Sequence, residues 1–335
     1  MRDKRMHSQK IGIVGSGNWG IGLGIAFALS GHQVIIWTRS EEKVKLLNDS
    51  RSHPLISPQA FPKTLSFSAS PDEIMDSSVI VSALPSQVTL SVWEKSFVGL
   101  VANQVLIHST KGLLSDGSPY ISERLSKLTQ KPWSFLTGPT FADEVARQLP
   151  SAMVLAVPQL TEDYANLRTI LSSKFLRIYL TDDLIGTQIC SALKNILAIA
   201  SGVLDGLELG HNTRAALMTR GLAEMTRLVR SAGGKSETAY GLAGMGDLLL
   251  TSTGPQSRNR KLGRELVRTG NLHDAQKTLN GEVAEGQYAT EIALKLALTH
   301  NLEMPITEAV HHLLSGRKPD DVMKILLARP AGLES

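Results

Sequence analysis

The sequence predicts an α/β domain with a mainly parallel sheet, followed by an all-helical domain. In the first half of the chain, short β-branched runs alternate with longer helical patterns, a rhythm typical of βαβ units. After Asp183 this rhythm stops, and apolar residues recur at helical spacing. The chain has 335 residues, more than a single core usually supports. We therefore expect two domains, covering residues 1–182 and 183–335.

The expected strands are the β-branched runs of the first half. They cover residues 11–14, 33–37, 79–83, 105–109 and 134–137, and runs at 152–157 and 175–180 extend the sheet around a helix near 162–172. Asp182 and Asp183 supply a helix start signal at the domain boundary. In the helical half, residues 231–240 are the clearest candidate for a flexible loop.

The composition excludes several classes of protein. The net charge is +4, and Lys and Arg are scattered among acids, so we expect no nucleic-acid partner. The sequence has no run of eighteen apolar residues, which a membrane span would need. No apolar segment of the secretory type follows the basic N-terminus. The single cysteine, Cys190, rules out an intramolecular disulfide and a thiolate zinc site. We therefore expect a cytoplasmic protein.

A glycine pattern follows the first expected strand and opens a helix. Residues 15–20 read GSGNWG, a GxGxxG in which the first glycine permits a tight turn and the second lets the backbone approach a pyrophosphate. The third lets the helix pack closely, and the helix N-terminus offers amide donors to the anion. The alternative is a purely structural turn. In this context the pattern predicts a Rossmann-type dinucleotide-binding domain over 1–182. The expected cofactor contacts here are Gly15, Gly17, Asn18, Trp19 and Gly20.

The end of the second expected strand bears on the choice of cofactor. An enzyme specific for NAD usually places Asp or Glu there to bind the ribose hydroxyls. Here Trp37 is followed by Thr38, Arg39 and Ser40, and no acid stands at the strand end. Arg39 and its hydroxyl neighbours favour the 2′-phosphate of NADP, with use of NAD as the competing interpretation. The other alternative is that Arg39 is only a solvated surface charge.

Further motifs appear along the chain in one order. They are SALPSQ at 82–87, STKGL at 109–113, GPTFADEVA at 138–146, ALKN at 192–195, GLAGMGDLLLT at 241–251, SRNRKLG at 257–263 and VAEG at 283–286. Together with GSGNWG they closely resemble the bacterial NAD(P)-dependent glycerol-3-phosphate dehydrogenases, over nearly the whole chain. The resemblance implies a helical substrate-binding domain over 183–335 of the 6-phosphogluconate dehydrogenase C-terminal type. It also implies reversible reduction of dihydroxyacetone phosphate to sn-glycerol 3-phosphate by NAD(P)H, feeding glycerophospholipid synthesis.

The reaction needs an acid. Reducing a ketone requires a hydride and a proton for the developing alkoxide, so a cationic acid must touch the carbonyl oxygen. Lys194 is the candidate, because it lies in a helix among apolar residues that disfavour its charged form and ease proton donation. The resemblance implies the same role. The alternative is a lysine that extends from the helix to solvent.

The remaining candidate residues fall into three groups. Lys111, at the carboxyl end of a strand, suits both cofactor and substrate, and the resemblance places Gly138 and Thr140 at the substrate and Ala142, Val283 and Glu285 at the dinucleotide. Ser257, Arg258 and Asn259 open a helix and offer donors to the substrate phosphate, and Arg258 also serves the cofactor. Asn195 and Thr251 complete the polar lining.

Some of these charged residues have competing interpretations. Asp247 accepts a hydrogen bond from a substrate hydroxyl, orients Lys194, or caps a helix that begins at Leu248. Beside Arg258, we expect Arg260, Lys261 and Arg264 to be largely a solvated helix face.

Two other classes of protein compete with this interpretation. A β-hydroxyacid or 6-phosphogluconate type dehydrogenase also uses a helix lysine, but it carries Asn four residues further on, where this chain has Ala198. A non-catalytic NADP-sensing protein would have little reason to keep Lys111, Lys194, Asp247 and Arg258 together. No pattern of histidines and carboxylates implies a metal. A homodimer is compatible with the sequence, which does not determine the oligomeric state.

Overall fold

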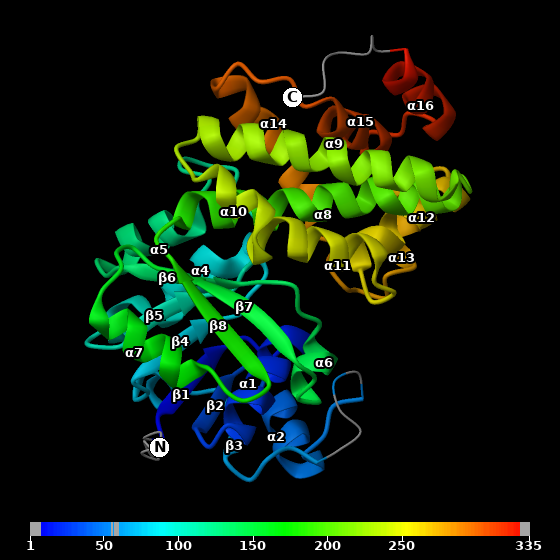
Figure 1. Ribbon diagram of the computed structural model, residues 1–335. Helices are drawn as coiled ribbons and strands as arrows, with labels where there is room; N and C mark the ends of the chain where they lie inside the picture. The colour runs from blue at the N-terminus through cyan, green and yellow to red at the C-terminus, as the bar shows by residue number, and fades with distance from the viewer. Residues whose placement is uncertain (1–7, 55, 57–59, 329–335) are drawn as a thin grey trace. The chain divides into compact units, whose positions relative to one another are not determined.

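The structure is a computed structural model, and it describes residues 8–54, 56 and 60–328 (Figure 1). The chain divides into two compact units, one of residues up to 111 with 120–184, and one of 112–119 with residues from 185 onward. The short segment 112–119 therefore groups with the helical unit, whereas the sequence suggested a single boundary near residue 182.

The first unit alternates strands and helices. Its strands are β1 (Lys10–Val14), β2 (Gln33–Trp37), β3 (Leu65–Ser68), β4 (Val79–Ser82), β5 (Val105–His108), β6 (Trp133–Thr137), β7 (Ser151–Ala156) and β8 (Leu176–Thr181). Its helices are α1 (Asn18–Leu29), α2 (Glu41–Ser50), α3 (Pro71–Met75), α4 (Ser86–Ser96), the 3₁₀ turn Val98–Leu100, α5 (Ile121–Thr129), α6 (Ala142–Ala146) and α7 (Glu162–Leu171).

The eight strands form one sheet in the order β3-β2-β1-β4-β5-β6-β7-β8. Every neighbouring pair is parallel except β6 and β7, and Figure 1 shows β7 and β8 side by side at one edge. β1 pairs with β2 on one side and β4 on the other, so the strand order reverses there. In sheets of this kind a ligand binds outside the carboxyl ends of the strands at such a reversal. The mainly parallel sheet expected from the sequence is confirmed.

The strand β3 was absent from the sequence prediction. Its four residues read LSFS, and their two serines are typical of a loop. β3 is an edge strand that pairs only with β2, and it buries Leu65 and Phe67 while Ser66 is exposed. A half-buried edge strand exposes part of its residues in this way, whereas the central strands β1, β4, β5 and β6 are buried over nearly their whole length because both of their faces are covered.

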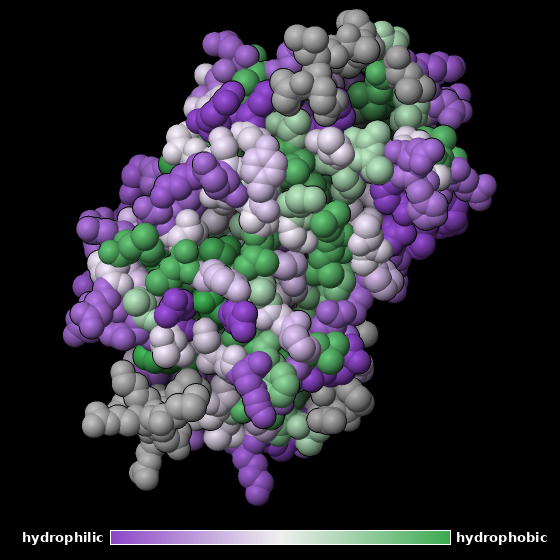
Figure 2. All heavy atoms as spheres, viewed as in Figure 1, coloured by the Kyte–Doolittle hydropathy of each residue, from purple (hydrophilic) through white to green (hydrophobic). Residues whose placement is uncertain are grey.

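Within the described residues, every regular secondary-structure element of the second unit is a helix, and the segment 112–119 is irregular. Its helices are α8 (Leu184–Gly206), α9 (Gly210–Ser231), α10 (Ser236–Tyr240), the π-helical turn Leu242–Gly246, α11 (Asp247–Thr253), α12 (Arg258–Thr269), α13 (Leu272–Lys277), α14 (Gly286–Thr299), α15 (Pro305–Leu314) and α16 (Pro319–Leu327). The loop expected over 231–240 is therefore only partly right, because its second half forms α10. Figure 2 shows hydrophilic side chains over much of the outer surface of this unit.

Helix α8 forms the centre of the helical unit. By length and composition alone it could cross a membrane, but 89% of its most apolar 18-residue stretch is buried inside the protein, as for a core helix. Gly202 of α8 and Gly263 of α12 allow these two helices to touch. An added Cβ would lie 1.9 Å from the Arg260 carbonyl oxygen at Gly202, and 2.0 Å from that of Ile199 at Gly263. This close crossing holds the beginning of α12 beside the middle of α8.

Candidate active site

The glycine loop joins β1 to α1. Gly15 has a φ of +120°, which favours glycine, and its N–H donates to the Trp37 carbonyl at the end of β2 (3.1 Å). An added Cβ at Gly20 would lie 2.0 Å from the Gly15 carbonyl oxygen, so the third glycine lets α1 begin against the loop. At Gly17 an added Cβ would meet nothing within 4 Å, so no internal contact requires glycine there. This exposed, open position fits the close approach of a pyrophosphate to the backbone.

A second group of residues gathers at the ends of β5 and β6. Trp19 Nε1 donates to Ser109 Oγ (3.0 Å), and the Lys111 ammonium lies 5.8 Å from the centre of the Trp19 ring, within cation–π range. Lys111 Nζ also donates to the Gly138 carbonyl (2.9 Å), and so does Thr140 Oγ1 (3.3 Å). The structure therefore brings Trp19, Lys111, Gly138 and Thr140 together, as the proposed shared contact with cofactor and substrate requires.

Two further predicted residues of this unit, Asn18 and Ala142, lie on or beside α1. Asn18 is the first residue of α1, and Ala142 is the first residue of α6, which packs against α1. Arg39 follows the end of β2 by two residues. Its side chain is exposed and makes no hydrogen bond or ion pair with a described residue.

Sequence reasoning missed Lys43. Its ammonium donates to the carbonyl oxygen of Ser16 in the glycine loop (2.9 Å), and burial lowers the pKa of Lys43. A signal was available, because Ser40 is the N-cap of α2 and accepts from the Lys43 N–H (3.2 Å). A cap at position 40 puts residue 43 in the first helical turn, next to the strand end.

In the helical unit, Lys194 is buried and held by polar partners. Its Nζ lies 3.0 Å from Asp247 Oδ1 and 2.8 Å from Thr251 Oγ1, and the Lys194 side chain is only 6% exposed. Thr251 Oγ1 also donates to Asp247 Oδ1 (3.2 Å). The expectation of apolar surroundings for Lys194 is therefore incomplete, because a buried carboxylate offsets the cost of burying the ammonium. The alternative of a lysine extending to solvent is wrong.

The structure also corrects one interpretation of Asp247. The N-cap of α11 is Gly246, and Asp247 is already the first helical residue. The π-helical turn over the preceding five residues leads directly into α11, so no cap is needed there. The Asp247 carboxylate is instead used by Lys194, as one of the expected roles had it.

Asn195 and Asn259 form a buried chain of amide hydrogen bonds. Asn259 Nδ2 donates to Asn195 Oδ1 (2.8 Å), and Asn259 Oδ1 accepts from the Gly286 N–H (2.9 Å). Gly286 ends the VAEG motif, in which Glu285 is the N-cap of α14 and Val283 is half-buried in the preceding loop. Three motifs that are far apart in the sequence therefore meet in this unit.

The beginning of α12 offers a place for an anion. Ser257 is its N-cap and accepts from the Arg260 N–H (3.2 Å), which leaves the hydroxyl hydrogen of Ser257 to donate. Arg258, the first residue of the helix, is exposed and pairs with no carboxylate among the described residues. An uncompensated guanidinium at a helix N-terminus suits a phosphate.

The expected solvated face of α12 is wrong for two of its three residues. Arg260 is half-buried, and its Nε donates to Asp205 Oδ2 (2.5 Å) while its Nη1 donates to the Thr253 carbonyl (2.6 Å). Lys261 Nζ donates to the Thr278 carbonyl (2.6 Å). Arg264 is exposed as expected. The two buried contacts attach the start of α12 to its neighbours and so support Arg258.

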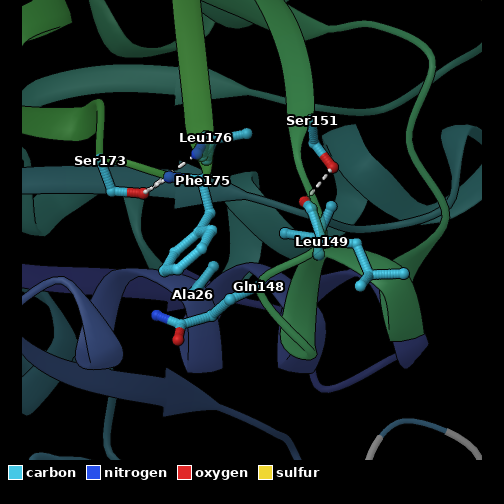
Figure 3. Close-up of a pocket in the computed structure, with 8 residues that line it drawn as sticks. Ala26, Gln148, Leu149, Ser151, Ser173, Phe175 and Leu176 are labelled. Carbon is cyan, nitrogen blue, oxygen red and sulfur yellow. Dashed lines mark hydrogen bonds between the residues drawn. The ribbon is translucent and has the colours of Figure 1, made fainter.

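A small cavity in the first unit does not compete with these residues (Figure 3). It has a volume of about 10 Å³, and Ala26, Gln148 and Phe175 are among the residues that line it. Ser173 Oγ accepts from the Phe175 N–H (3.2 Å). The cavity holds no more than about one water molecule, so it cannot take a substrate.

Both halves of the chain are similar to one known family. Residues 10–163 match the family model described as NAD-dependent glycerol-3-phosphate dehydrogenase N-terminus, and residues 183–324 match the C-terminus of the same family. A glycerol-3-phosphate dehydrogenase (NAD(P)+) from Koribacter versatilis is 38% identical over 97% of this chain and 98% of its own. The one from Agrobacterium fabrum is 37% identical over 98% and 100%.

A solved structure agrees with these matches. Glycerol-3-phosphate dehydrogenase from Coxiella burnetii superposes with a TM-score of 0.90 at 37% identity, and the match covers 96% of this chain and 99% of that one. The fold expected from the sequence, a Rossmann-type domain followed by a helical domain, is thereby confirmed. Because both family models match and full-length relatives exceed 30% identity, this chain belongs to the NAD-dependent glycerol-3-phosphate dehydrogenase family.

Proposed function

We propose that this protein catalyses the reversible NAD(P)H-dependent reduction of dihydroxyacetone phosphate to sn-glycerol 3-phosphate, with Lys194 as the general acid and base. The observation that carries the proposal is the buried ammonium of Lys194 between Asp247 and Thr251. A buried lysine–carboxylate pair contributes little to stability, so its presence is better explained by a functional role, and ketone reduction needs a cationic acid. The family of the chain supports the substrate.

Lys194 acts at the carbonyl oxygen of the substrate. As negative charge develops on that oxygen, Lys194 Nζ first stabilises it electrostatically and then gives it a proton. In the reverse direction, neutral Lys194 takes the proton from the hydroxyl. The Asp247 carboxylate, 3.0 Å from Nζ, stabilises the protonated form of Lys194, which gives the proton in one direction and is regenerated in the other, and it orients the ammonium.

The residues of the first unit fit a dinucleotide. When bound, the nicotinamide supplies a hydride to the carbonyl carbon. Gly15, Gly17 and Gly20 with the N-terminus of α1 would hold the pyrophosphate, on the evidence of the open space at Gly17. The further contacts that we propose for the dinucleotide are Asn18, Trp19, Arg39, Lys111, Ala142, Arg258, Val283 and Glu285. Arg39 favours NADP, and NAD is the alternative.

The substrate phosphate would lie at the beginning of α12. Arg258 offers a planar guanidinium and Ser257 a hydroxyl. Asn259 offers an amide nitrogen, and its side-chain oxygen is held in place by the Gly286 N–H. Lys111, Gly138, Thr140 and Asn195 are the remaining substrate contacts that we propose. On this basis residues 1–182 are the dinucleotide-binding domain and 183–335 the substrate-binding domain.

The proposed place of the reaction is the cytoplasm, where its product would feed glycerophospholipid synthesis. The one cysteine of the chain, Cys190, is a buried thiol that forms no disulfide, which suits a reducing compartment. In the cell, the reaction would run in the direction of ketone reduction.

An assay with the purified full-length chain tests the proposal. NADPH and NADH oxidation is followed with dihydroxyacetone phosphate and with unphosphorylated dihydroxyacetone, and reduction of NADP+ and NAD+ is followed with a 3-hydroxy acid. We expect turnover with the phosphorylated ketone and far less with the other two. Preferred turnover of the 3-hydroxy acid would move the chain to the β-hydroxyacid type of reaction, and no turnover with any of them would favour a cofactor sensor.

A further inference from the structure

The carboxyl end of β2 is tied to the glycine loop through Lys43. The Trp37 carbonyl accepts from the Gly15 N–H (3.1 Å), and the Lys43 ammonium donates to the Ser16 carbonyl (2.9 Å). The Lys43 N–H in turn is capped by Ser40 Oγ (3.2 Å). The ammonium of Lys43 is thereby held between the loop that suits the pyrophosphate and the strand end at which this fold places the adenosine ribose.

One histidine and two acids of the same helix bear on the charge of Lys43. Burial and then the charge of Lys43 lower the pKa of His53, so the ammonium lies within electrostatic range of that ring. Glu41 and Glu42 stand in the first turn of the same helix, but both are exposed and neither forms an ion pair with Lys43. Within the described residues no carboxylate pairs with Lys43, whose ammonium uses one donor on Ser16. An ammonium carries three donors, so two are available to an anion.

We propose that Lys43 is the main cation that recognises the 2′-phosphate of NADP, with Arg39 in a secondary role. This inference rests on the proposed function, because it assumes a nicotinamide dinucleotide on the glycine loop. The argument is one of preorganisation: Arg39 is exposed and unsupported, so ordering it on a phosphate costs side-chain entropy. Lys43 is half-buried and already anchored at Ser16, so it loses little freedom on binding. Its partial burial also strengthens its attraction to a dianion.

The competing role for Lys43 is structural. If its hydrogen bond to Ser16 only braces the glycine loop, removing the ammonium would weaken every dinucleotide to the same degree. If it reads the 2′-phosphate, the loss would be confined to ligands that carry that group. The ratio of affinities for NADPH and NADH therefore separates the two roles.

The experiment measures dissociation constants of NADPH and NADH by fluorescence titration of the full-length chain. The variants are Lys43→Met, which keeps the stem without the charge, Lys43→Arg, and Arg39→Met. Lys45→Met is the matched control, since Lys45 lies exposed on the same helix. Adenosine 2′,5′-bisphosphate and ADP serve as competitors with and without the 2′-phosphate.

We expect Lys43→Met to raise the dissociation constant of NADPH about 10-fold or more, in line with the loss of a charge-assisted hydrogen bond. The dissociation constant of NADH should rise by less than about 3-fold. In Lys43→Met, adenosine 2′,5′-bisphosphate should bind more weakly, as NADPH does, whereas the affinity for ADP should not change. Lys43→Arg should retain most of the preference for NADPH over NADH. Arg39→Met should lose less of this preference than Lys43→Met does. Equal losses for both cofactors, or a larger loss in Arg39→Met, would overturn the proposal. These are binding measurements, so an error in the proposed substrate would appear in turnover and leave them unchanged.

Discussion

The Nζ of Lys194 lies 3.0 Å from Oδ1 of Asp247, and the two side chains are 6% and 1% exposed. A carboxylate this deeply buried beside an ammonium stabilises the charged form of its partner and orients it. The pair also depends on α8 and α11 being correctly packed. The consequences for activity can be separated from those for folding by choosing variants that keep the size of each side chain.

Replacing Asp247 with Asn should lower kcat by about 10²-fold, because general acid catalysis depends on a positioned and charged group. The amide keeps the shape of the side chain but removes the negative charge that stabilises the Lys194 ammonium. Steady-state kinetics with dihydroxyacetone phosphate measures the effect. The matched control is Thr251→Val, which removes only the hydroxyl partner of Lys194 and should cost less. If the two variants had equal turnover, the carboxylate charge would have no special role.

Arg258→Met should raise the KM for dihydroxyacetone phosphate about 10-fold to 150-fold, the range of a charge-assisted pair. Activity on unphosphorylated dihydroxyacetone should change little, because that ketone has no phosphate to lose. The comparison of the two substrates is the measurement. Arg264→Met is the control, since Arg264 is an exposed arginine on the same helix. The same loss on both substrates would assign Arg258 to the cofactor alone.

His108 predicts a stability that depends on pH. Its ring is fully buried against Phe135, both ring nitrogens lack hydrogen-bond partners within the described structure, and burial lowers the pKa of His108 to about 3. Between about 3 and 6.5 the unfolded chain binds the proton and the folded chain does not. Above about pH 6.5 the ring is neutral in both states, and His108 does not make the free energy of unfolding depend on pH. Below that pH, proton uptake by the unfolded chain lowers the free energy of unfolding by about 1.4 kcal/mol per pH unit.

The variant His108→Phe should lack this part of the acid destabilisation. Urea unfolding at about pH 7.5 and about pH 5.5 measures the difference in free energy of unfolding for parent and variant. The control His273→Phe changes an exposed histidine and should keep the parent slope. A variant at position 108 with an unchanged slope would show that another group governs acid unfolding.

The sequence predicts much of this fold because its main signals are local. The apolar runs at β1, β4 and β5 are buried on both faces, and the glycines of the loop after β1 have their expected geometry. The edge strand β3 was not predicted because two of its four residues are serines, which are typical of loops, and only Leu65 and Phe67 give an apolar signal. Grouping the motifs of the helical unit required the resemblance, since spacing alone does not bring Asn195 to Asn259.

The misjudged residues are those whose partners are distant in sequence. Arg260 was expected in solvent, but its partner Asp205 is 55 residues away on α8. Lys43 was overlooked because its acceptor, the Ser16 carbonyl, is 27 residues earlier. A backbone acceptor leaves no sign in the sequence. Helical periodicity reports which residues face the core, and it does not report which polar group a long side chain reaches there.

Lys194→Arg is the sharpest test of proton transfer. Arginine keeps a positive charge beside Asp247 but cannot give up its proton near neutral pH, whereas lysine can. We therefore expect turnover to fall by at least about 10²-fold, the lower end of what positioned acid catalysis contributes. Lys194→Ala should fall further, because it also removes the charge that stabilises the developing alkoxide.

Cofactor binding is the control for both Lys194 variants. The glycine loop and Lys194 belong to different units of the chain, so NADPH titration should give dissociation constants within a few-fold of the parent. A folded Lys194→Arg protein that binds NADPH and keeps nearly full turnover would exclude proton transfer by residue 194. Lys111, whose ammonium contacts the Gly138 carbonyl, would then be the next residue to test as the acid.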